Sequence, residues 1–326
     1  MSILIGGGGM SHRNGRGGAG EQTESAEGGA SEQMSRRRLV TASVLAGASA
    51  SAGAALAPCA AEAQPRRRER VEDRVAELEA HVATLERQVA RAHARGAVEN
   101  VWSRYQYLHT AFRDAEIITD LWVKPGTPSI SAQYTNTGVY NTWDSVMAYH
   151  RNRPSPVGKL LVHFTTSPLI EVAEDGETAK GVWIIAGVES GMSEPEVAAR
   201  APANFFEPGL VEGKKVWAHW VQCRYALDFL KQDGEWRIWH FRCVEISRAP
   251  FSKNWIAFAS EMQANQRTSQ FHNDLAYFGD DGRPVFMPPV DGPPKSIAHS
   301  YRTDRAFAIE PPLPRPYRTF SETFDY

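Results

Sequence analysis

The sequence has few cysteines and no excess of charge of one sign. Its 326 residues include three cysteines, and its 36 lysines and arginines nearly balance its 38 aspartates and glutamates. A formal net charge of −2 does not provide the basic surface that nucleic-acid binding requires, so we expect no nucleic-acid partner. The hydrophobic content of 42% is typical of a folded, soluble chain.

Several motifs with a known chemistry are also missing. The chain contains no nucleophile elbow, no phosphate-binding loop and no dinucleotide fingerprint. It has no HExxH motif, and its cysteines do not form a C-x-x-C pair. These absences favour a site without a metal, and metal binding by His109, His163, His219 and Glu189 is the alternative.

The N-terminal region lacks an apolar run long enough to span a bilayer. Residues 1–33 are rich in Gly, Ser and Glu and are expected to be disordered. In residues 34–63, Arg36-Arg37-Arg38 precedes a weakly apolar stretch and the small-residue site Ala61-Glu62-Ala63, which is typical of a twin-arginine export signal. We expect an exported mature protein, periplasmic or extracellular, with no membrane anchor.

Residues 64–96 carry a heptad pattern. Apolar residues recur at alternating spacings of four and three, as in a coiled coil: Val71, Val75, Leu78, Val82, Leu85 and Val89. We interpret the segment as a helical stalk for self-association, with a helix lying on its own domain as the alternative. Gly96 is expected to stop or kink it. A second helix from about Ala97 has a stripe that should face a sheet: Val98, Trp102, Tyr105, His109 and Phe112.

Two runs rich in aromatic and β-branched residues flank Asp233-Gly234, which predicts a tight hairpin with Gln232 opposite Glu235. Strict alternation places one mostly apolar set on the covered face: Trp217, His219, Val221, Cys223, Tyr225, Leu227, Phe229, Trp236, Ile238, His240, Arg242 and Val244. The titratable members of this set are candidates for a site, and hydrogen-bonded core residues are the alternative.

Cys223 and Cys243 lie on the two arms of this hairpin, whereas Cys59 lies in the predicted export signal. A two-residue loop would point the two thiols to opposite faces. A three-residue loop would set them opposite each other and permit a disulfide. We favour two separate buried thiols.

The remaining segments have simpler patterns. A short strand over 130–136 and a small helix over 142–150 precede a second hairpin, which turns at Asp175-Gly176. A Pro-rich and Glu-rich segment over 191–213 is long enough to act as a flap. In the C-terminal extension, 250–326, a helix from Trp255 to Met262 precedes a Pro-rich arm that should strap across the domain or wrap a neighbouring subunit.

The order of these elements, with four short motifs, resembles the nuclear transport factor 2-like superfamily in its SnoaL-like branch, over residues 97–249. The motifs are Arg104-Tyr105, His163-Phe164, E-D-G-E-T-A-K-G at 174–181 and D-G-E-W-R-I at 233–238. The resemblance implies an α+β fold, a cone-shaped barrel of a strongly curved, mostly antiparallel sheet wrapped around helices. It also implies a deep pocket for a small-molecule substrate and a homo-oligomer, either a dimer or a trimer.

Within this family the chain looks most like the scytalone dehydratase type, in which buried His, Asp and Tyr side chains remove water without a cofactor. His163 matches the family's pocket histidine, and Tyr134 matches a tyrosine that holds a catalytic water. Tyr107 and His109 fall near a Tyr-Asp pair whose Asp is absent here. Glu189 stands where the relative has its second histidine.

These residues predict a cofactor-independent lyase or isomerase that acts on a small aromatic or polycyclic molecule by general acid–base catalysis. Dehydration is the leading reaction, and formaldehyde-releasing retro-aldol cleavage is a close variant. The alternative is a non-catalytic exported small-molecule-binding protein. Two sets of residues carry the hypothesis: the catalytic candidates His163, Glu189, Tyr107 and His109, and the substrate-binding candidates Tyr134, Trp143, Trp217, His219, Tyr225, His240 and Arg242.

His163 is the leading proton-transfer group, because imidazole titrates near neutral pH. Glu189 could orient it or serve as a second base. Their pairing depends on the turn at Asp175-Gly176-Glu177: a three-residue turn places both side chains on one face, and a two-residue turn separates them.

Overall fold

The computed structural model describes residues 60–134, 138–151, 157–199, 203–265, 277–278, 284–285, 288–295, 301–306 and 310–321. The segment predicted to be disordered, 1–33, lies outside these ranges, and the predicted export signal overlaps them only at 60–63. Within the described ranges, no helix combines the length and the apolar character needed to cross a membrane.

A single helix, α2, covers Ala60–Thr110. The predicted stop or kink at Gly96 is wrong: Gly96 lies inside the helix, and a Cβ there would meet no atom within 4 Å. From Val98 onward the predicted stripe is buried at Val98, Trp102, Tyr105 and His109. Its last predicted member, Phe112, lies beyond the helix end with a φ of 57°.

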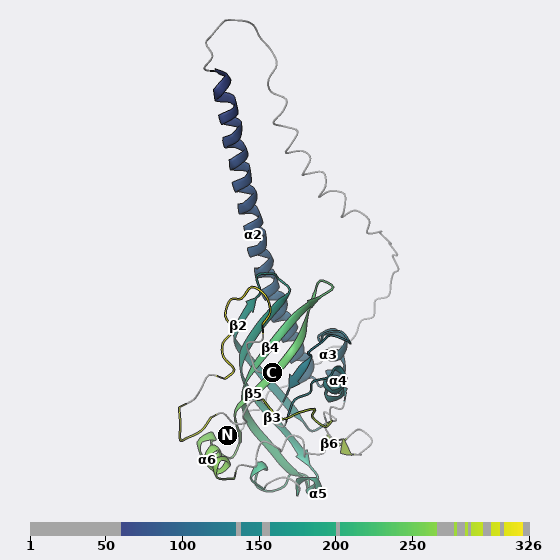
Figure 1. The fold of residues 1–326 in the computed structure, drawn as a ribbon. Coiled ribbons are helices and arrows are strands. Elements are labelled where there is room, and N and C mark those ends of the chain that lie inside the picture. The colour runs from purple at the N-terminus through teal and green to yellow at the C-terminus, as the bar shows by residue number, and fades with distance from the viewer. Residues whose placement is uncertain are drawn as a thin grey trace, which may run out of the picture. The chain divides into compact units, whose positions relative to one another are not determined.

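Five strands form one curved, open sheet in the order β1-β5-β4-β3-β2 (Figure 1). Their bounds are β1 Ser131–Gln133, β2 Leu160–Val172, β3 Thr178–Ser193, β4 Lys215–Gln232 and β5 Glu235–Pro250. β1 runs parallel to β5, and the other pairs are antiparallel. Besides α2, the fold has two short helices that pack on each other: α3 (Asp114–Asp120) and α4 (Trp143–Arg151). The predicted α+β fold class is confirmed.

The β4–β5 hairpin turns as predicted. Gln232 is paired with Glu235, and Asp233 and Gly234 have φ values of 51° and 83°, the left-handed conformation that a type I′ turn requires. Farther from the turn, the register shifts between Asp228 and Phe229, because Phe229 pairs with Ile238 whereas Asp228 pairs with His240.

This bulge corrects the predicted face of three residues. The extra residue, Trp239, reverses the alternation along β5, so that His240, Arg242 and Val244 lie on the face opposite to Ile238. The prediction that they share the covered face with His219 and Tyr225 is therefore wrong.

The β2–β3 hairpin closes with Val172 opposite Ala179, and the loop between them is longer than either predicted turn. The register then shifts between Thr166 and Leu169, where Ser167 has a φ of 52°. Beyond the shift, Leu161 pairs with Glu189 and His163 pairs with Gly187. His163 and Glu189 therefore share a face, and a bulge rather than the turn decides this.

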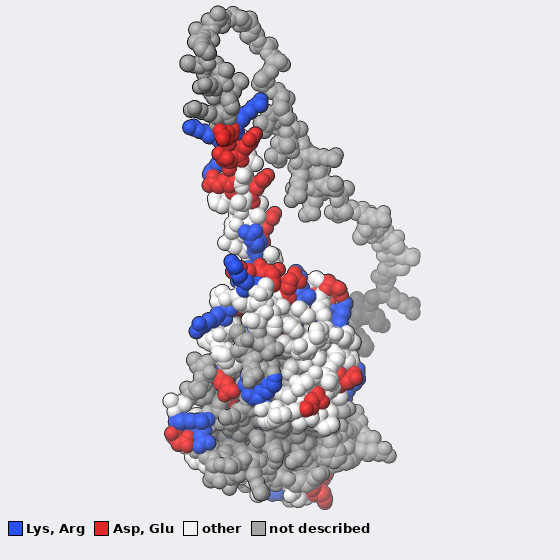
Figure 2. Space-filling model, in the orientation of Figure 1, with Lys and Arg blue, Asp and Glu red and all other residues white. Residues whose placement is uncertain are grey.

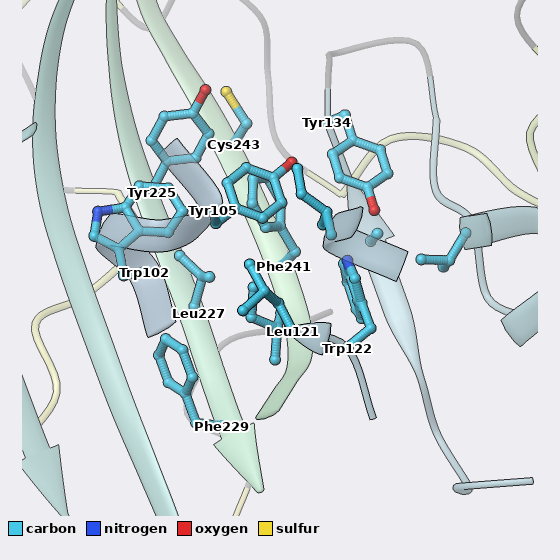
Figure 3. Close-up of a cluster of buried hydrophobic side chains, with 14 of the residues drawn as sticks. Trp102, Tyr105, Leu121, Trp122, Tyr134, Tyr225, Leu227, Phe229, Phe241 and Cys243 are labelled. Atoms are coloured by element: carbon cyan, nitrogen blue, oxygen red, sulfur yellow. The ribbon is translucent and has the colours of Figure 1, made fainter. Parts of the chain in front are cut away.

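Aromatic side chains fill the space between α2 and the sheet. Figure 3 shows Trp102 and Tyr105 of α2 beside Tyr225 and Phe241. The Trp102 ring lies 5.0 Å from that of Trp183 and 5.1 Å from that of Tyr225, measured between centroids. Cys223 and Cys243 are both free thiols, as predicted. The prediction that a two-residue loop points them to opposite faces is wrong, because the extra residue Trp239 brings both into this cluster.

The segments after β3 and β5 cover parts of the sheet. α5 (Pro195–Ala198) and the 3₁₀ helix η1 (Ala203–Phe205) belong to a small cluster with Trp217. After α6 (Trp255–Asn265), β6 (Tyr277–Phe278) pairs with β7 (Pro284–Val285).

The C-terminal arm straps across its own domain in the described residues 310–321. The backbone N–H of Glu174 donates to the carbonyl of Tyr317 at 3.0 Å, and the Phe320 ring lies 4.7 Å from that of Trp239. Residues 310–321 therefore follow the first of the two predicted alternatives, in which the arm straps across its own domain.

Candidate active site

A buried imidazole and carboxylate form the centre of the site. The Nε2 atom of His163 on β2 lies 3.0 Å from Oε1 of Glu189 on β3, and the exposed fractions of the two side chains are 4% and 12%. Gly187, which pairs with His163, makes room for the ring. Because the carboxylate only accepts, Nε2 donates to Glu189, and in the neutral tautomer that this requires the other ring nitrogen, Nδ1, presents its lone pair.

Arg248 on β5 holds Glu189 from its other side. Its Nη1 donates to Oε2 of Glu189 at 2.8 Å, and its Nε donates to Glu245 at 3.1 Å. Burial lowers the pKa of Arg248, but the charges of Glu189 and Glu245 outweigh burial and raise the pKa above its ordinary value. Arg248 thus stays charged and stabilises the ionised form of Glu189.

A second polar network forms where three helix ends meet. His109 lies in the last turn of α2, His150 in the last turn of α4, and Asp114 in the first turn of α3. Nδ1 of His109 lies 3.0 Å from Oδ1 of Asp114, and Nδ1 of His150 lies 3.2 Å from the same oxygen. The carboxylate of Asp114 at a helix start has the sign that the helix dipole favours.

The hydrogen bonds around His150 fix its tautomer. Trp122 Nε1 lies 3.2 Å from His150 Nε2, and an indole N–H only donates, so Nε2 accepts. His150 Nδ1 therefore carries the proton and donates it to Asp114. The Tyr134 hydroxyl, 2.9 Å from the same Nε2, is a second donor that shares this one lone pair with Trp122. The proton of Tyr134 is therefore already used within the protein.

The two networks approach each other at His109 and His163, whose ring centroids lie 6.1 Å apart. Tyr105 stacks on His109 at 5.6 Å, and the Tyr225 ring lies 6.4 Å from that of His163. Burial raises the pKa of Tyr225 well above its ordinary value, so its hydroxyl stays protonated.

Buried polar atoms in this region lack a hydrogen-bond partner within the described part of the chain. They are Nδ1 of His163, Oγ1 of Thr165, both amide atoms of Gln106 and Nε1 of Trp102. Thr165 follows His163 by two residues on β2 and so faces the same side. Gln106 lies one helical turn from both His109 and Trp102. Buried polar groups normally find a partner, so these atoms suit the polar groups of a bound molecule or of water.

Several predicted site residues lie elsewhere. Tyr107 is 80% exposed, because it lies on the side of α2 away from the buried stripe. His240 and Arg242 face the C-terminal arm: His240 contacts Asp228 at 2.8 Å, and Arg242 donates to Glu310 at 3.0 Å.

Two other predicted residues have structural partners. His219 donates from Nε2 to the carbonyl of Phe205 at 2.8 Å, and Trp217 packs in the same small cluster. Trp143 is partly buried at the edge of the main core, where its Nε1 donates to the carbonyl of Val123 at 3.2 Å.

Sequence reasoning missed Asp114, His150, Arg248 and Gly187. Asp114 follows the long helix after only three residues and His150 ends a short helix, so the shared position at helix ends was a usable signal. Arg248 had none, because it lies beyond the predicted hairpin. In the described ranges, no group of three or more His, Cys, Asp or Glu side chains is arranged to hold a metal ion.

The fold is thus a curved, open sheet packed on helices, and the His163–Glu189 pair lies on the side of the sheet that faces them. Residues 90–242 match the sequence profile of the SnoaL-like domain. This part of the chain is similar to the SnoaL-like family.

Comparison with solved structures gives the following similarities. The hexachlorocyclohexane dehydrochlorinase LinA-type3 from Novosphingobium barchaimii is 15% identical, with a TM-score of 0.37, over 51% of this chain and 96% of that one. A nuclear transport factor 2-like superfamily protein from Salmonella enterica is 12% identical, with a TM-score of 0.34, over 50% of this chain and 99% of that one. No curated protein matches the chain.

Proposed function

We propose that the SnoaL-like domain is a cofactor-independent lyase or isomerase that acts on a small aromatic or polycyclic organic molecule by general acid–base catalysis. The observation that carries the proposal is the pairing of His163 with Glu189. One nitrogen of the buried imidazole is held by the carboxylate, and the other has no partner among the described residues. This arrangement orients a base without consuming it.

In the leading reaction, dehydration, Nδ1 of His163 removes a proton from a substrate carbon. A carbon–carbon double bond forms while the bond to the leaving oxygen breaks. The departing oxygen then takes the proton from the imidazolium and leaves as water, which restores neutral His163. Glu189 stabilises the imidazolium during the step, and Arg248 keeps Glu189 ionised and in place.

A carbonyl oxygen next to the substrate carbon that loses its proton needs a hydrogen-bond donor. Negative charge develops on this oxygen as the proton leaves the carbon. Tyr225 suits this role, since burial keeps its hydroxyl protonated and its ring lies near that of His163. Gln106 and Thr165 supply further polar atoms without partners in the described region. Tyr134 suits it less, because its proton is donated to His150.

Exchange of substrate protons in D₂O tests the proposal before the natural substrate is known. A base at Nδ1 should exchange the protons next to the carbonyl of a bicyclic aryl ketone such as 1-tetralone, followed by NMR. We expect His163→Ala to slow the catalysed exchange by on the order of 10²- to 10⁴-fold. Glu189→Gln should slow it less, because the base remains but is no longer held by a charge.

The matched control is His93→Ala, which removes an exposed imidazole from α2 and should leave exchange unchanged. Exchange at the uncatalysed rate for ketones that bind the protein would overturn the proposal and favour the non-catalytic binding function. An equal rate in the unsubstituted chain and in His163→Ala would remove His163 from the mechanism.

The sequence pattern of residues 34–63 supports a further proposal, that the protein is exported. Arg37 belongs to both possible arginine pairs in Arg36-Arg37-Arg38. Replacing Arg37 with Lys should retain the chain in the cytoplasm, as measured by cell fractionation. Equal amounts outside the cytoplasm in both forms would contradict export by this route.

A further inference from the structure

The N-terminal part of α2 presents a stripe of apolar side chains to solvent. Six residues of the stripe are about half exposed: Val71 55%, Val75 47%, Leu78 48%, Val82 52%, Leu85 59% and Val89 55%. No described side chain between 67 and 90 is buried. After the stripe, the guanidinium of Arg91 donates to the carbonyl of Val172 on β2 at 3.1 Å.

We infer that this stripe is the interface of a parallel, in-register, two-stranded coiled coil between two copies of the chain. The spacing assigns Val75, Val82 and Val89 to heptad position a. It assigns Val71, Leu78 and Leu85 to position d, where leucine thus stands in the two heptads nearest the domain. A β-branched residue at a with leucine at d favours two strands over three or four. The apolar stripe thus specifies the number of copies as well as the surface.

The stripe faces away from the chain's own domain. At 3.6 residues per turn, the mean direction of the heptad stripe lies about 170° around the helix axis from that of the buried stripe Val98, Trp102, Tyr105 and His109. One straight helix therefore cannot bury both stripes on the same domain. A second copy can cover the heptad stripe without contacting the side of α2 that packs on the sheet.

The charges beside the stripe favour the parallel orientation. Position g holds Arg74 and His81, and position e holds Glu79 and Glu86. In a parallel pair, g faces e of the following heptad in the other copy, so Arg74 meets the partner's Glu79 and His81 meets the partner's Glu86. In an antiparallel pair e faces e, which sets glutamates against glutamates. Figure 2 shows charged side chains of both signs flanking uncharged surface along this part of α2.

The number of copies is tested by sedimentation equilibrium on the purified full chain. We expect two copies, and we expect the double variant Leu78→Lys/Leu85→Lys to weaken association at least tenfold while leaving the thermal unfolding of the domain unchanged. The control variant, Ala76→Lys/Ala90→Lys, adds the same charges at position b and should remain dimeric. A trimer, a monomeric unsubstituted chain, or a lysine variant at positions 78 and 85 that still dimerises equally well overturns the inference.

The orientation is tested by disulfide trapping in chains that carry Cys59→Ser. Val75→Cys and Val89→Cys should each form a covalent dimer alone, because position a meets position a in a parallel, in-register pair. In an antiparallel pair centred on the stripe, position a meets position d, so Val75→Cys would cross-link only when it is mixed with Leu85→Cys. Cross-linking that needs the mixture, or none in either sample, overturns the inference. The Cys59→Ser chain without a new cysteine controls for Cys223 and Cys243, which are buried.

Discussion

Gly187 on β3 makes room for the imidazole of His163 on β2. A Cβ at position 187 would lie 2.6 Å from Cδ2 of His163 and 2.6 Å from the carbonyl oxygen of Val162. Real Cβ atoms do not approach other atoms this closely, so either the ring or the strand would have to move. Because glycine has no side chain, the His163 ring can lie over β3 and reach Glu189.

Gly187→Ala is predicted to disrupt the site, although the position contributes no side chain to its hydrogen bonds. The added methyl should displace the His163 ring and lengthen its contact with Glu189. We expect the catalysed proton exchange to fall at least tenfold and the free energy of unfolding to fall by about 1–3 kcal/mol, as for other overpacked positions. NMR of the imidazole and chemical denaturation measure the two effects.

Gly96→Ala is the matched control. Gly96 lies inside α2, and a Cβ there meets nothing within 4 Å. Alanine favours the helix over glycine, so this variant should gain about 0.5–1 kcal/mol of stability and keep full exchange activity. If both alanine variants behave alike, the close approach of Gly187 and His163 has no energetic consequence.

The sequence was sufficient to predict the fold class, because each of its strong local patterns is compatible with one type of secondary structure. Asp233-Gly234 forms its turn at the predicted pair, and the stripe Val98, Trp102, Tyr105 and His109 is buried as expected. The faces of individual residues were harder to predict. One extra residue in β5 moved His240 and Arg242 to the other face of the sheet, and composition does not mark the position of a bulge.

The site was predictable only where one pair of strands decides it. His163 and Glu189 were candidates because the family resemblance placed pocket residues at these positions, on the two arms of one hairpin. Arg248 and Asp114 come from segments far away in the chain, and their roles depend on how α3 and the end of β5 pack. No pattern within a single segment of sequence contains that information.

Arg248→Met is predicted to be strongly destabilising near neutral pH. The variant leaves two carboxylates, Glu189 and Glu245, without the positive charge that they share. Removing one partner from a buried ion pair typically costs about 3–5 kcal/mol. The cost should shrink as the pH is lowered, because protonated carboxyls no longer need a counter-charge. Urea unfolding at neutral and acidic pH measures the difference.

The control is Arg302→Met, which removes an ion pair with Asp304 whose side chains are 36% and 55% exposed. Solvent screens such an exposed pair, so little change is expected. An Arg248→Met chain as stable as this control would show that the buried charges are compensated elsewhere.

Buried tyrosines predict a loss of stability in alkaline solution. Burial raises the pKa of Tyr134 and of Tyr225 well above the ordinary value of 10.0. Above that pH an unfolded chain has lost these phenolic protons, whereas the folded chain keeps them. The unfolded state then binds fewer protons, so the free energy of unfolding falls as the pH rises.

This contribution is fully present below about pH 10 and is lost above it. Denaturant unfolding between about pH 9 and about pH 11 should show the decline, and Tyr134→Phe should make it less steep. A pH slope identical in the variant and the unsubstituted chain would exclude a buried, protonated phenol at position 134.

Phe320→Ala is predicted to loosen the C-terminal arm. The Phe320 ring lies 4.7 Å from that of Trp239, and the buried ammonium of Lys180 lies 4.4 Å from its centroid. Losing this half-buried ring removes apolar contact and a cation–π interaction, which together should lower the free energy of unfolding by about 1–3 kcal/mol.

The control is Leu313→Ala, at a site on the same arm that is 52% exposed, which should change the free energy of unfolding by less than about 0.5 kcal/mol. Urea unfolding compares the two, and limited proteolysis should cut the arm faster only in Phe320→Ala. If Phe320→Ala and Leu313→Ala were equally stable and were cleaved equally fast, the contacts of the Phe320 ring with Trp239 and Lys180 would not hold the arm on the domain.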